Sequence, residues 1–309
     1  MNMNRAYRRP GRARVRRKRL KRLCLCLFVI LILVLILCVG KRVILALAGA
    51  VTDRGGAEFS QERNLNAVSP DVKVASPVRY SREDAAAQLE TMSNQDRRYA
   101  QIIENAAVYP DSLLKDLANN PEMLEFVLGY PKDPVSLDSI LLTDTERDSS
   151  CPLLLQWDQR WGYQPYGEDN IAISGCGPTA LSMVITGLTH SREITPAQVA
   201  EYSSANDYYQ EGAGTKWALM TEGAAHYGLT AEEVVNDENA MKDALDRGAL
   251  IICSVSEGDF TTSGHFIVIC GYGKSGFWIN DPFCIYRSEQ SWTFQQLTTQ
   301  IAGMWAMSV

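Results

Sequence analysis

The 309-residue sequence lacks several motifs, and each absence excludes a class of protein or site. No two cysteines have the CxxC spacing and no cysteine–histidine spacing fits zinc, so we expect no zinc site. The phosphate-binding GxxxxGK(S/T) loop is missing, which excludes an ATPase of that type. There is no internal repeat. Histidine is scarce, and His190, His226 and His265 are the three candidates for a general base.

Acidic residues are absent from residues 1–42, which carry 13 Lys and Arg. Because the whole chain has 30 basic and 36 acidic residues, the remainder holds 17 basic against 36 acidic side chains. Its formal net charge is therefore −19. We expect this acidic part to be soluble and to bind nucleic acid poorly.

A long uncharged run follows the basic residues. Residues 23–40, LCLCLFVILILVLILCVG, carry no charge and make roughly 27 Å of helix, enough to cross a bilayer core. We predict a basic cytoplasmic segment over residues 1–22, a retained transmembrane signal-anchor over 23–40 and export of the remainder. A cleaved signal peptide is the alternative, because ALAGA at residues 46–50 resembles a cleavage site. Lys41 and Arg42 argue against cleavage, since they interrupt the apolar run before that site.

The eight cysteines divide into two groups. Three lie in the apolar run and are interpreted as fillers, and five lie beyond it: Cys151, Cys176, Cys253, Cys270 and Cys284. An odd number in an exported part predicts at least one free thiol. Cys253 and Cys270 lie in neighbouring apolar runs and face each other if those runs pair. Cys151 and Cys284 pair only if the fold brings them together, and we expect these thiols to be reduced.

Composition divides the exported part into three regions. Residues 41–80 are rich in small, polar and proline residues and are predicted to be a flexible tether. Residues 81–150 are predicted to form a helical stalk or subdomain, which begins at a cap made by Ser81 and Asp84. Within it, Asn120 is predicted to cap a helix that has Pro121 at its first position.

Residues 151–309 are predicted to form one domain of the α+β class. The helical patterns come first, at residues 176–188, 195–203, 215–227 and 238–247. The β-rich runs ALIICSV, HFIVICGYG, GFWIND and CIYRS come later, separated by turn residues. Helices followed by an antiparallel sheet are typical of the α+β arrangement.

The stretch ISGCGPTAL places Cys176 between two glycines at the predicted start of a helix. A cysteine nucleophile reacts as its thiolate, and the N–H groups and dipole of a helix N-terminus favour an anion. We expect Gly175 and Gly177 to leave the backbone open to a substrate carbonyl, and Pro178 to be tolerated near the helix start. The alternative is an ordinary buried cysteine at a helix start.

A thiol nucleophile needs a base, and His265 is the best placed of the three histidines. It follows Gly264 and is the polar entry to an otherwise apolar predicted strand. Asp281 is the candidate to orient the imidazole, because it ends the next strand and lies beside His265 if the two strands form a hairpin. Asn280 is the alternative orienter, but strand alternation points it to the opposite face.

Acyl transfer also requires hydrogen-bond donors for the developing oxyanion. The backbone N–H of Cys176 is one candidate, and the side chain of Gln156, which ends the apolar run LLLQ, is the other. Trp157, Trp161, Trp217 and Gly264 are candidates for the wall of a substrate groove. Packing in the core explains each of these tryptophans equally well.

The motifs Gln156, SGCGPT, GHF and NDP occur in that order over residues 153–302. This combination resembles the stand-alone relatives of the bacteriocin-leader peptidases, papain-like cysteine peptidases of the C39-like type. The resemblance implies a bacterial origin and a papain-like fold. It also implies Cys176 as nucleophile, His265 as general base and acid, Asp281 as orienter and Gln156 as oxyanion donor.

The predicted protein is a membrane-anchored, exported cysteine peptidase that acts on peptide or protein substrates without a metal or organic cofactor. The leader peptidases proper are fused to a multi-span transporter and an ATPase, whereas this chain has one predicted span. Cleavage after a double glycine is therefore not carried over. The rivals are a cell-wall amidase or endopeptidase with the same catalytic residues, and a binding ectodomain with a vestigial triad.

Overall fold

The computed structural model describes residues 72–309. The predicted basic segment, the signal-anchor and the tether up to residue 71 lie outside the described residues. None of the helices in residues 72–309 combines the length and the hydrophobicity needed to cross a bilayer.

The first described elements form what we call the helical segment, residues 82–128. It comprises α2 (Arg82–Ser93), α3 (Arg98–Glu104), α4 (Asp111–Asn119) and α5 (Leu124–Leu128), with the 3₁₀ helices η2 (Ala106–Val108) and η3 (Pro121–Met123). The predicted caps are confirmed: Ser81 and Asp84 form a reciprocal capping box at α2. The Asn120 side chain accepts a hydrogen bond from the backbone N–H of Glu122, with Pro121 in the first turn of η3.

A second group of helices follows. These are η4 (Leu137–Ser139), α6 (Asp144–Asp148), α7 (Ile171–Ser174), α8 (Cys176–Thr189), α9 (Pro196–Ala205), η5 (Trp217–Met220), α10 (Glu222–His226), α11 (Glu238–Asp246), α12 (Ile285–Ser288) and α13 (Phe294–Thr298). The predicted helices at residues 176–188, 195–203 and 238–247 correspond to α8, α9 and α11. The helix predicted over residues 215–227 is divided at Thr221 into η5 and α10, and Thr215 belongs to the short strand β4.

Most of the strands join one sheet. Two small hairpins are formed by β1 (Pro165–Tyr166) with β2 (Asp169–Asn170) and by β3 (Tyr209–Gln210) with β4 (Gly214–Thr215). The main sheet contains β5 (Thr230–Glu233), β6 (Leu250–Ser256), β7 (Gly264–Gly273), β8 (Gly276–Asn280), β9 (Ser291–Trp292) and β10 (Ile301–Ser308). Its order is β5-β10-β6-β7-β8-β9, and all neighbouring strands are antiparallel. Helices on an antiparallel sheet confirm the predicted α+β class.

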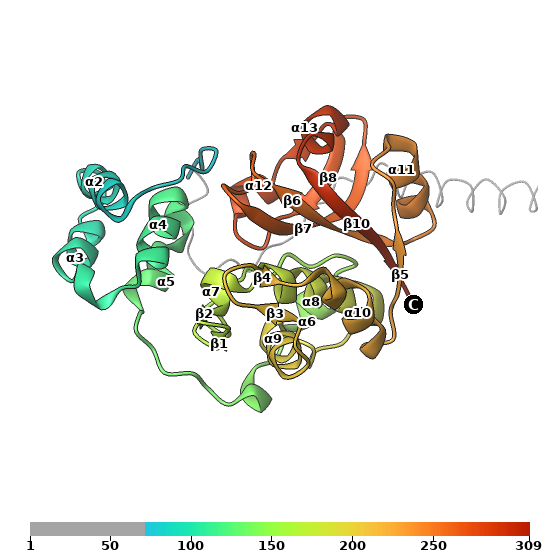
Figure 1. The fold of residues 1–309 in the computed structure, drawn as a ribbon, viewed down its shortest axis with the longest axis horizontal. Helices are drawn as coiled ribbons and strands as arrows, with labels where there is room; N and C mark the ends of the chain where they lie inside the picture. The colour runs from blue at the N-terminus through green and yellow to red at the C-terminus, as the bar shows by residue number, and fades with distance from the viewer. Residues whose placement is uncertain (1–71) are drawn as a thin grey trace, which may run out of the picture. The chain divides into compact units, whose positions relative to one another are not determined.

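The main sheet is buried on both faces (Figure 1). Alternation along β6 sends Leu250 and Ile252 toward α8 and α9, and sends Ile251 and Cys253 toward α11 and α13. Helix α8 is itself enclosed, because every residue from 177 to 187 is buried. Its first residue, Cys176, is half-buried and therefore held at the edge of a rigid core.

The helical segment shares its core with the later part of the chain. Leu89, Ile102 and Phe126 belong to one cluster with Trp157 and Ile285, and all five side chains are buried. Phe126 stacks on Tyr163, with ring centroids 4.3 Å apart. The helical segment therefore lies against the residues around α12, and the predicted domain boundary near residue 150 stays a prediction.

Two strand expectations differ from the structure. The run CIYRS, predicted as a strand, contains α12, whose first backbone N–H groups are bound by a distant carboxylate described below. The sequence patterns also do not predict β5 or β10. Strand β10 pairs with β5 on one side and with β6 on the other, and this places Trp305 of β10 in the sheet.

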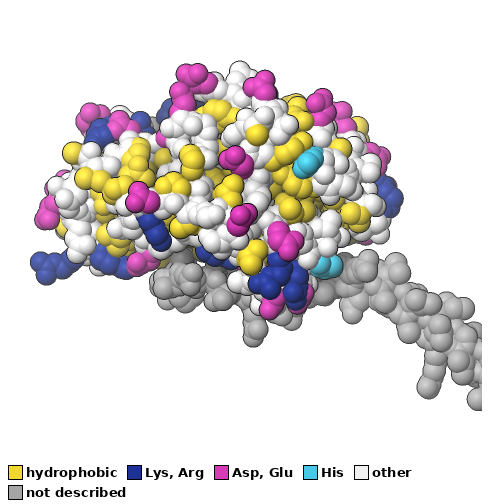
Figure 2. Space-filling model, turned by 90° about the horizontal axis from the view of Figure 1, so that it is seen from below, with side chains coloured by type: hydrophobic (Ala, Val, Ile, Leu, Met, Phe, Trp, Pro, Cys, Tyr) yellow, Lys and Arg dark blue, Asp and Glu magenta, His cyan; other side chains and the backbone are white. Residues whose placement is uncertain are grey.

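Figure 2 shows one face of the described residues, on which acidic and basic side chains are interspersed with apolar ones.

Candidate active site

Cys176 is the first residue of α8, as the sequence predicts. The short helix α7 ends at Ser174, and Gly175 turns the chain between the two helices. No side chain caps α8, so its first N–H groups are free of a capping partner within the described residues. A helix of 14 residues places the positive end of its dipole at Cys176.

The two glycines beside Cys176 are required by packing. A Cβ atom at Gly175 would lie 2.5 Å from the carbonyl oxygen of Ile171, and one at Gly177 would lie 2.6 Å from the Thr215 side chain. These distances are too short for a Cβ atom, so neither position can hold a residue larger than glycine unless a neighbour moves. The expectation that both glycines leave open space for a substrate is therefore wrong, because both positions are already filled by neighbours.

His265 is the second residue of β7, where the strand lies opposite Val255 of β6. Its side chain is buried, whereas the preceding Gly264 is exposed. A Cβ atom at Gly264 would meet nothing closer than 4.0 Å, so the chain is open at this point. The imidazole therefore lies just beneath the surface, as predicted for a residue at the rim of a site.

Asp281 contacts His265 through the predicted hairpin. Strands β7 and β8 pair antiparallel through a turn at residues 273–276, which brings the two residues together. His265 Nε2 lies 2.7 Å from Asp281 Oδ1, and the carboxylate is fully buried. Asn280 faces the other way and donates a hydrogen bond to the Cys151 carbonyl oxygen. The alternative orienter is thereby placed away from the imidazole.

The charges of this group support one another. Burial alone lowers the pKa of His265, but Asp281, which hydrogen-bonds to the ring, and the Cys176 thiol outweigh burial and raise the pKa to about 9. Burial alone raises the pKa of Asp281, but Arg287 and His265 outweigh it and hold the pKa at about 2. Because Nε2 is occupied by Asp281, Nδ1 is the ring nitrogen that remains for the thiol.

Arg287 is a component of this site that the sequence analysis missed. Its Nε donates a 2.6 Å hydrogen bond to Asp281 Oδ2, and both side chains are buried. The backbone N–H of Phe283 donates to Asp281 Oδ1 at 2.8 Å. Burial opposes the charge of Arg287, but Asp281 outweighs it and raises the pKa of the guanidinium. The sequence feature that could have indicated Arg287 is its charge, which is the only one in the run CIYRS.

Gln156 lies beside the turn that leads into Cys176. It is 2% exposed, and its Nε2 donates to the Ala172 carbonyl at 2.7 Å and more weakly to that of Ile173 at 3.4 Å. Its backbone N–H donates to the Pro282 carbonyl at 2.8 Å. The fold thus brings Gln156 close to the start of α8 and to the loop after Asp281. The side-chain nitrogen of Gln156 is directed at the carbonyl groups of α7.

The three tryptophans occupy different environments. Trp161 is 0% exposed and donates to the Leu155 carbonyl, and Trp157 is buried against the helical segment. Both rings are buried in the core, which the sequence analysis gave as the alternative to a place in the groove wall. Trp217 is 48% exposed, packs edge-to-face on Trp305 and donates to Ser254 Oγ, so it stays a candidate for substrate contact.

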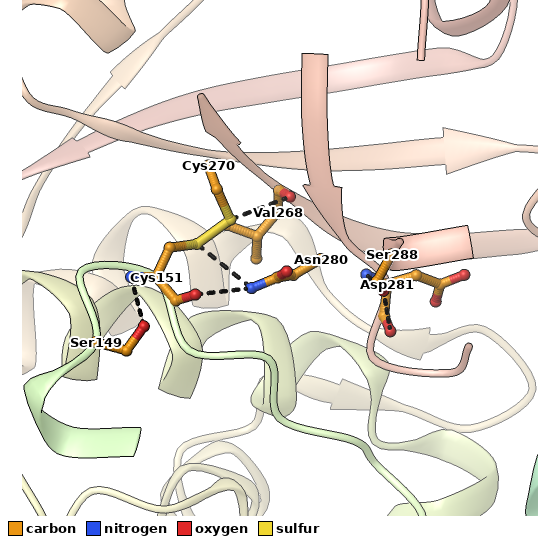
Figure 3. Close-up of a disulfide and its surroundings, with 7 residues drawn as sticks. All are labelled: Ser149, Cys151, Val268, Cys270, Asn280, Asp281 and Ser288. Atoms are coloured by element: carbon orange, nitrogen blue, oxygen red, sulfur yellow. Dashed lines mark hydrogen bonds between the residues drawn. A yellow bond between two sulfur atoms is a disulfide. The ribbon is translucent and has the colours of Figure 1, made fainter. Parts of the chain in front are cut away.

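Cys151 and Cys270 form a disulfide, contrary to the expectation of reduced thiols (Figure 3). The chain at residue 151 passes beside β7, which the spacing in sequence does not reveal. Figure 3 also shows Asn280 directed at the disulfide, while the backbone N–H of Asp281 bonds to Ser288. Cys253 pairs with Ile267 across strands β6 and β7, and its side chain lies on the face of the sheet opposite the disulfide. Both Cys253 and Cys284 are free, buried thiols.

Residues 72–309 contain no group of His, Cys, Asp or Glu side chains arranged to hold a metal ion.

Comparison with known proteins gives one family and one solved structure. The sequence profile of the Peptidase C39-like family matches residues 150–308. A crystal structure of a candidate C39-like peptidase from Bacillus anthracis aligns at 16% identity with a TM-score of 0.30, over 50% of this chain and 94% of that chain. The comparison with curated proteins gave no significant match.

Proposed function

The chain belongs to the Peptidase C39-like family, a family of cysteine peptidases, and we propose that it hydrolyses peptide bonds with Cys176 as nucleophile. The observation that carries this proposal is the 2.7 Å contact of His265 with Asp281 beside a thiol at the start of α8. This arrangement supports the proposal, because a thiol mechanism needs a nucleophile, a base and a group that orients the base.

In the proposed acylation step, the Cys176 thiol transfers its proton to Nδ1 of His265. The thiolate attacks the substrate carbonyl carbon, and the C–N bond breaks as the imidazolium donates its proton to the leaving amine. This leaves a thioester. In deacylation, His265 takes a proton from water and the resulting hydroxide attacks the thioester. The C–S bond then breaks, the carboxylic acid product leaves, and the imidazolium returns its proton to the Cys176 sulfur. Asp281 stabilises the imidazolium throughout.

The oxyanion is proposed to bind between the Cys176 backbone N–H and the Gln156 amide. A side-chain amide carries two N–H donors, and the short bond to Ala172 uses one of them. The second N–H is only weakly engaged, by Ile173 at 3.4 Å. A small rotation of this buried amide would direct the second donor at a developing negative charge.

We also propose that the enzyme is anchored by residues 23–40 and acts outside the cytoplasm. The charge-free run preceded by basic residues supports this orientation. The Cys151–Cys270 disulfide supports it independently, because disulfides persist mainly in oxidising compartments.

The test is hydrolysis by the full chain, purified in mild detergent, with an unstructured protein and with muropeptides as separate substrates. We expect fragments of the protein substrate, and their loss in Cys176→Ala. Cleavage of muropeptides alone would replace the proposed substrate with the cell wall. Cleavage that persists in Cys176→Ala would contradict the mechanism.

A further inference from the structure

The loop that follows Asp281 is held from two directions. The Phe283 carbonyl oxygen accepts hydrogen bonds from Asn120 Nδ2 at 2.6 Å and from Trp157 Nε1 at 2.8 Å. Asn120 belongs to the helical segment, which lies outside residues 150–308 that match the family profile. A part of the chain beyond the family domain thus fixes the backbone two residues after Asp281.

Glu122 makes the most specific of these contacts. Its side chain is buried, and its two carboxylate oxygens accept separate hydrogen bonds from the backbone N–H groups of Ile285 and Tyr286, at 2.7 and 2.8 Å. These are the first residues of α12, whose N–H groups have no partner within the helix. One buried carboxylate therefore satisfies two backbone donors and fixes where α12 begins.

Helix α12 carries Arg287, the second charged partner of Asp281. A continuous series of contacts thus runs from Glu122 through α12 and Arg287 to Asp281, and from there to His265. We propose that Glu122 is a positioning residue for the catalytic triad, and that the helical segment forms part of the active-site framework. This inference rests on the proposed function.

The chemistry of the contact requires a carboxylate. Glutamine has nearly the same shape, but its NH₂ group is a donor and would face one of the two backbone N–H donors. One buried N–H would then lose its partner, and the start of α12 would move to regain one. The negative charge of Glu122 also acts on the buried guanidinium of Arg287, which has one hydrogen-bonded carboxylate among the described residues.

The experiment compares Glu122→Gln with Glu125→Gln in the full chain. Glu125 lies three residues further on in the same segment, but its side chain is about half exposed and pairs with Arg98. The measurements are kcat, KM and the pH profile of Cys176 alkylation by iodoacetamide, with the Cys176 peptide resolved by mass spectrometry. We expect Glu122→Gln to lower kcat by up to roughly a hundredfold with little change in KM. Its alkylation near pH 6 should fall, while Glu125→Gln behaves like the parent chain.

A double variant shows whether Glu122 acts through Arg287. If it does, Glu122→Gln combined with Arg287→Gln loses little more kcat than Arg287→Gln alone. Fully additive losses would contradict the route through α12. If Glu122→Gln does not unfold cooperatively, Glu122→Asp takes its place, because it keeps the charge but is too short to bind both N–H groups.

The parent chain separates this inference from the proposed function. If parental Cys176 shows no alkylation that depends on His265, the proposed function fails first. If that dependence is present, and folded Glu122→Gln matches the parent in kcat and in its pH profile, the positioning role of Glu122 is wrong.

Discussion

The two charged partners of Asp281 reach it by different routes. His265 lies 16 residues away and is brought to Asp281 by a hairpin of adjacent strands. Arg287 is closer in sequence, but it lies on a four-residue helix whose start is bound by Glu122, 163 residues from Ile285. The hairpin is encoded locally, whereas the position of Arg287 depends on a distant segment. Substituting His265 and Arg287 one at a time therefore separates the contribution of the local hairpin from that of the distant helical segment.

The largest effect is expected when His265 and Arg287 both lose the Asp281 carboxylate that they bind. Asp281→Asn keeps the shape but leaves His265 and Arg287 without their carboxylate, and the amide favours the wrong tautomer of the imidazole. We expect kcat to fall by roughly ten-thousandfold. Steady-state kinetics measure the loss, and thermal unfolding verifies that the variant folds. Activity within tenfold of the parent would remove Asp281 from the mechanism.

Loss of the long-range partner alone is expected to affect stability strongly. Arg287→Gln leaves the fully buried Asp281 carboxylate without its guanidinium, which should cost roughly 3–5 kcal/mol in the free energy of unfolding. Arg247→Gln is the matched control, because Arg247 forms an exposed pair with Glu232 and should change stability by less than about 1 kcal/mol. Equal effects in denaturant titrations would show that burial of the pair at Asp281 is unimportant.

The hairpin side has its own covalent support, because the Cys151–Cys270 disulfide attaches β7 to the chain start of the family domain. Replacing both cysteines by serine should lower the free energy of unfolding by roughly 2–4 kcal/mol. The same loss should follow from adding a reductant to the parent chain, and reductant should leave the double variant unchanged. A parent chain indifferent to reductant would contradict a structural role for this bond.

The smallest effect is expected from pH, which weakens the two contacts without removing a side chain. The pKa of His265 is raised from 6.5 to about 9, so its contribution to stability is complete below pH 6.5 and is lost as pH rises through 9. The pKa of Asp281 is lowered from 3.8 to about 2, so its contribution is present above pH 3.8 and is lost as pH falls through 2. Stability should decline between pH 6.5 and 9 in the parent but less so in His265→Ala. An equal decline in both would assign it to other groups.

The difference between the two routes also explains what could be predicted from sequence. Cys176 begins α8, His265 is the second residue of β7 and Asp281 directly follows β8, so turn signals and strand alternation were enough to place them. Arg287 was missed because CIYRS has a β-rich composition and was predicted as a strand, whereas the run forms a helix whose first N–H groups bind the distant Glu122 carboxylate. The disulfide was missed for the same reason, since its cysteines are 119 residues apart. The reason for Gly175 and Gly177 was misjudged because it lies in neighbours that only the fold supplies.

The most direct test of the account is the pH dependence of Cys176 alkylation in the full chain, from pH 4 to 9, beside His265→Ala. Iodoacetamide reacts with the thiolate, and mass spectrometry of the Cys176 peptide separates it from the other cysteines. We predict rapid alkylation near pH 6 in the parent and its loss in the variant, as a thiolate–imidazolium pair requires. If both proteins instead react as an ordinary thiol of pKa about 8.5, Cys176 is not activated by His265 and the peptidase proposal is contradicted.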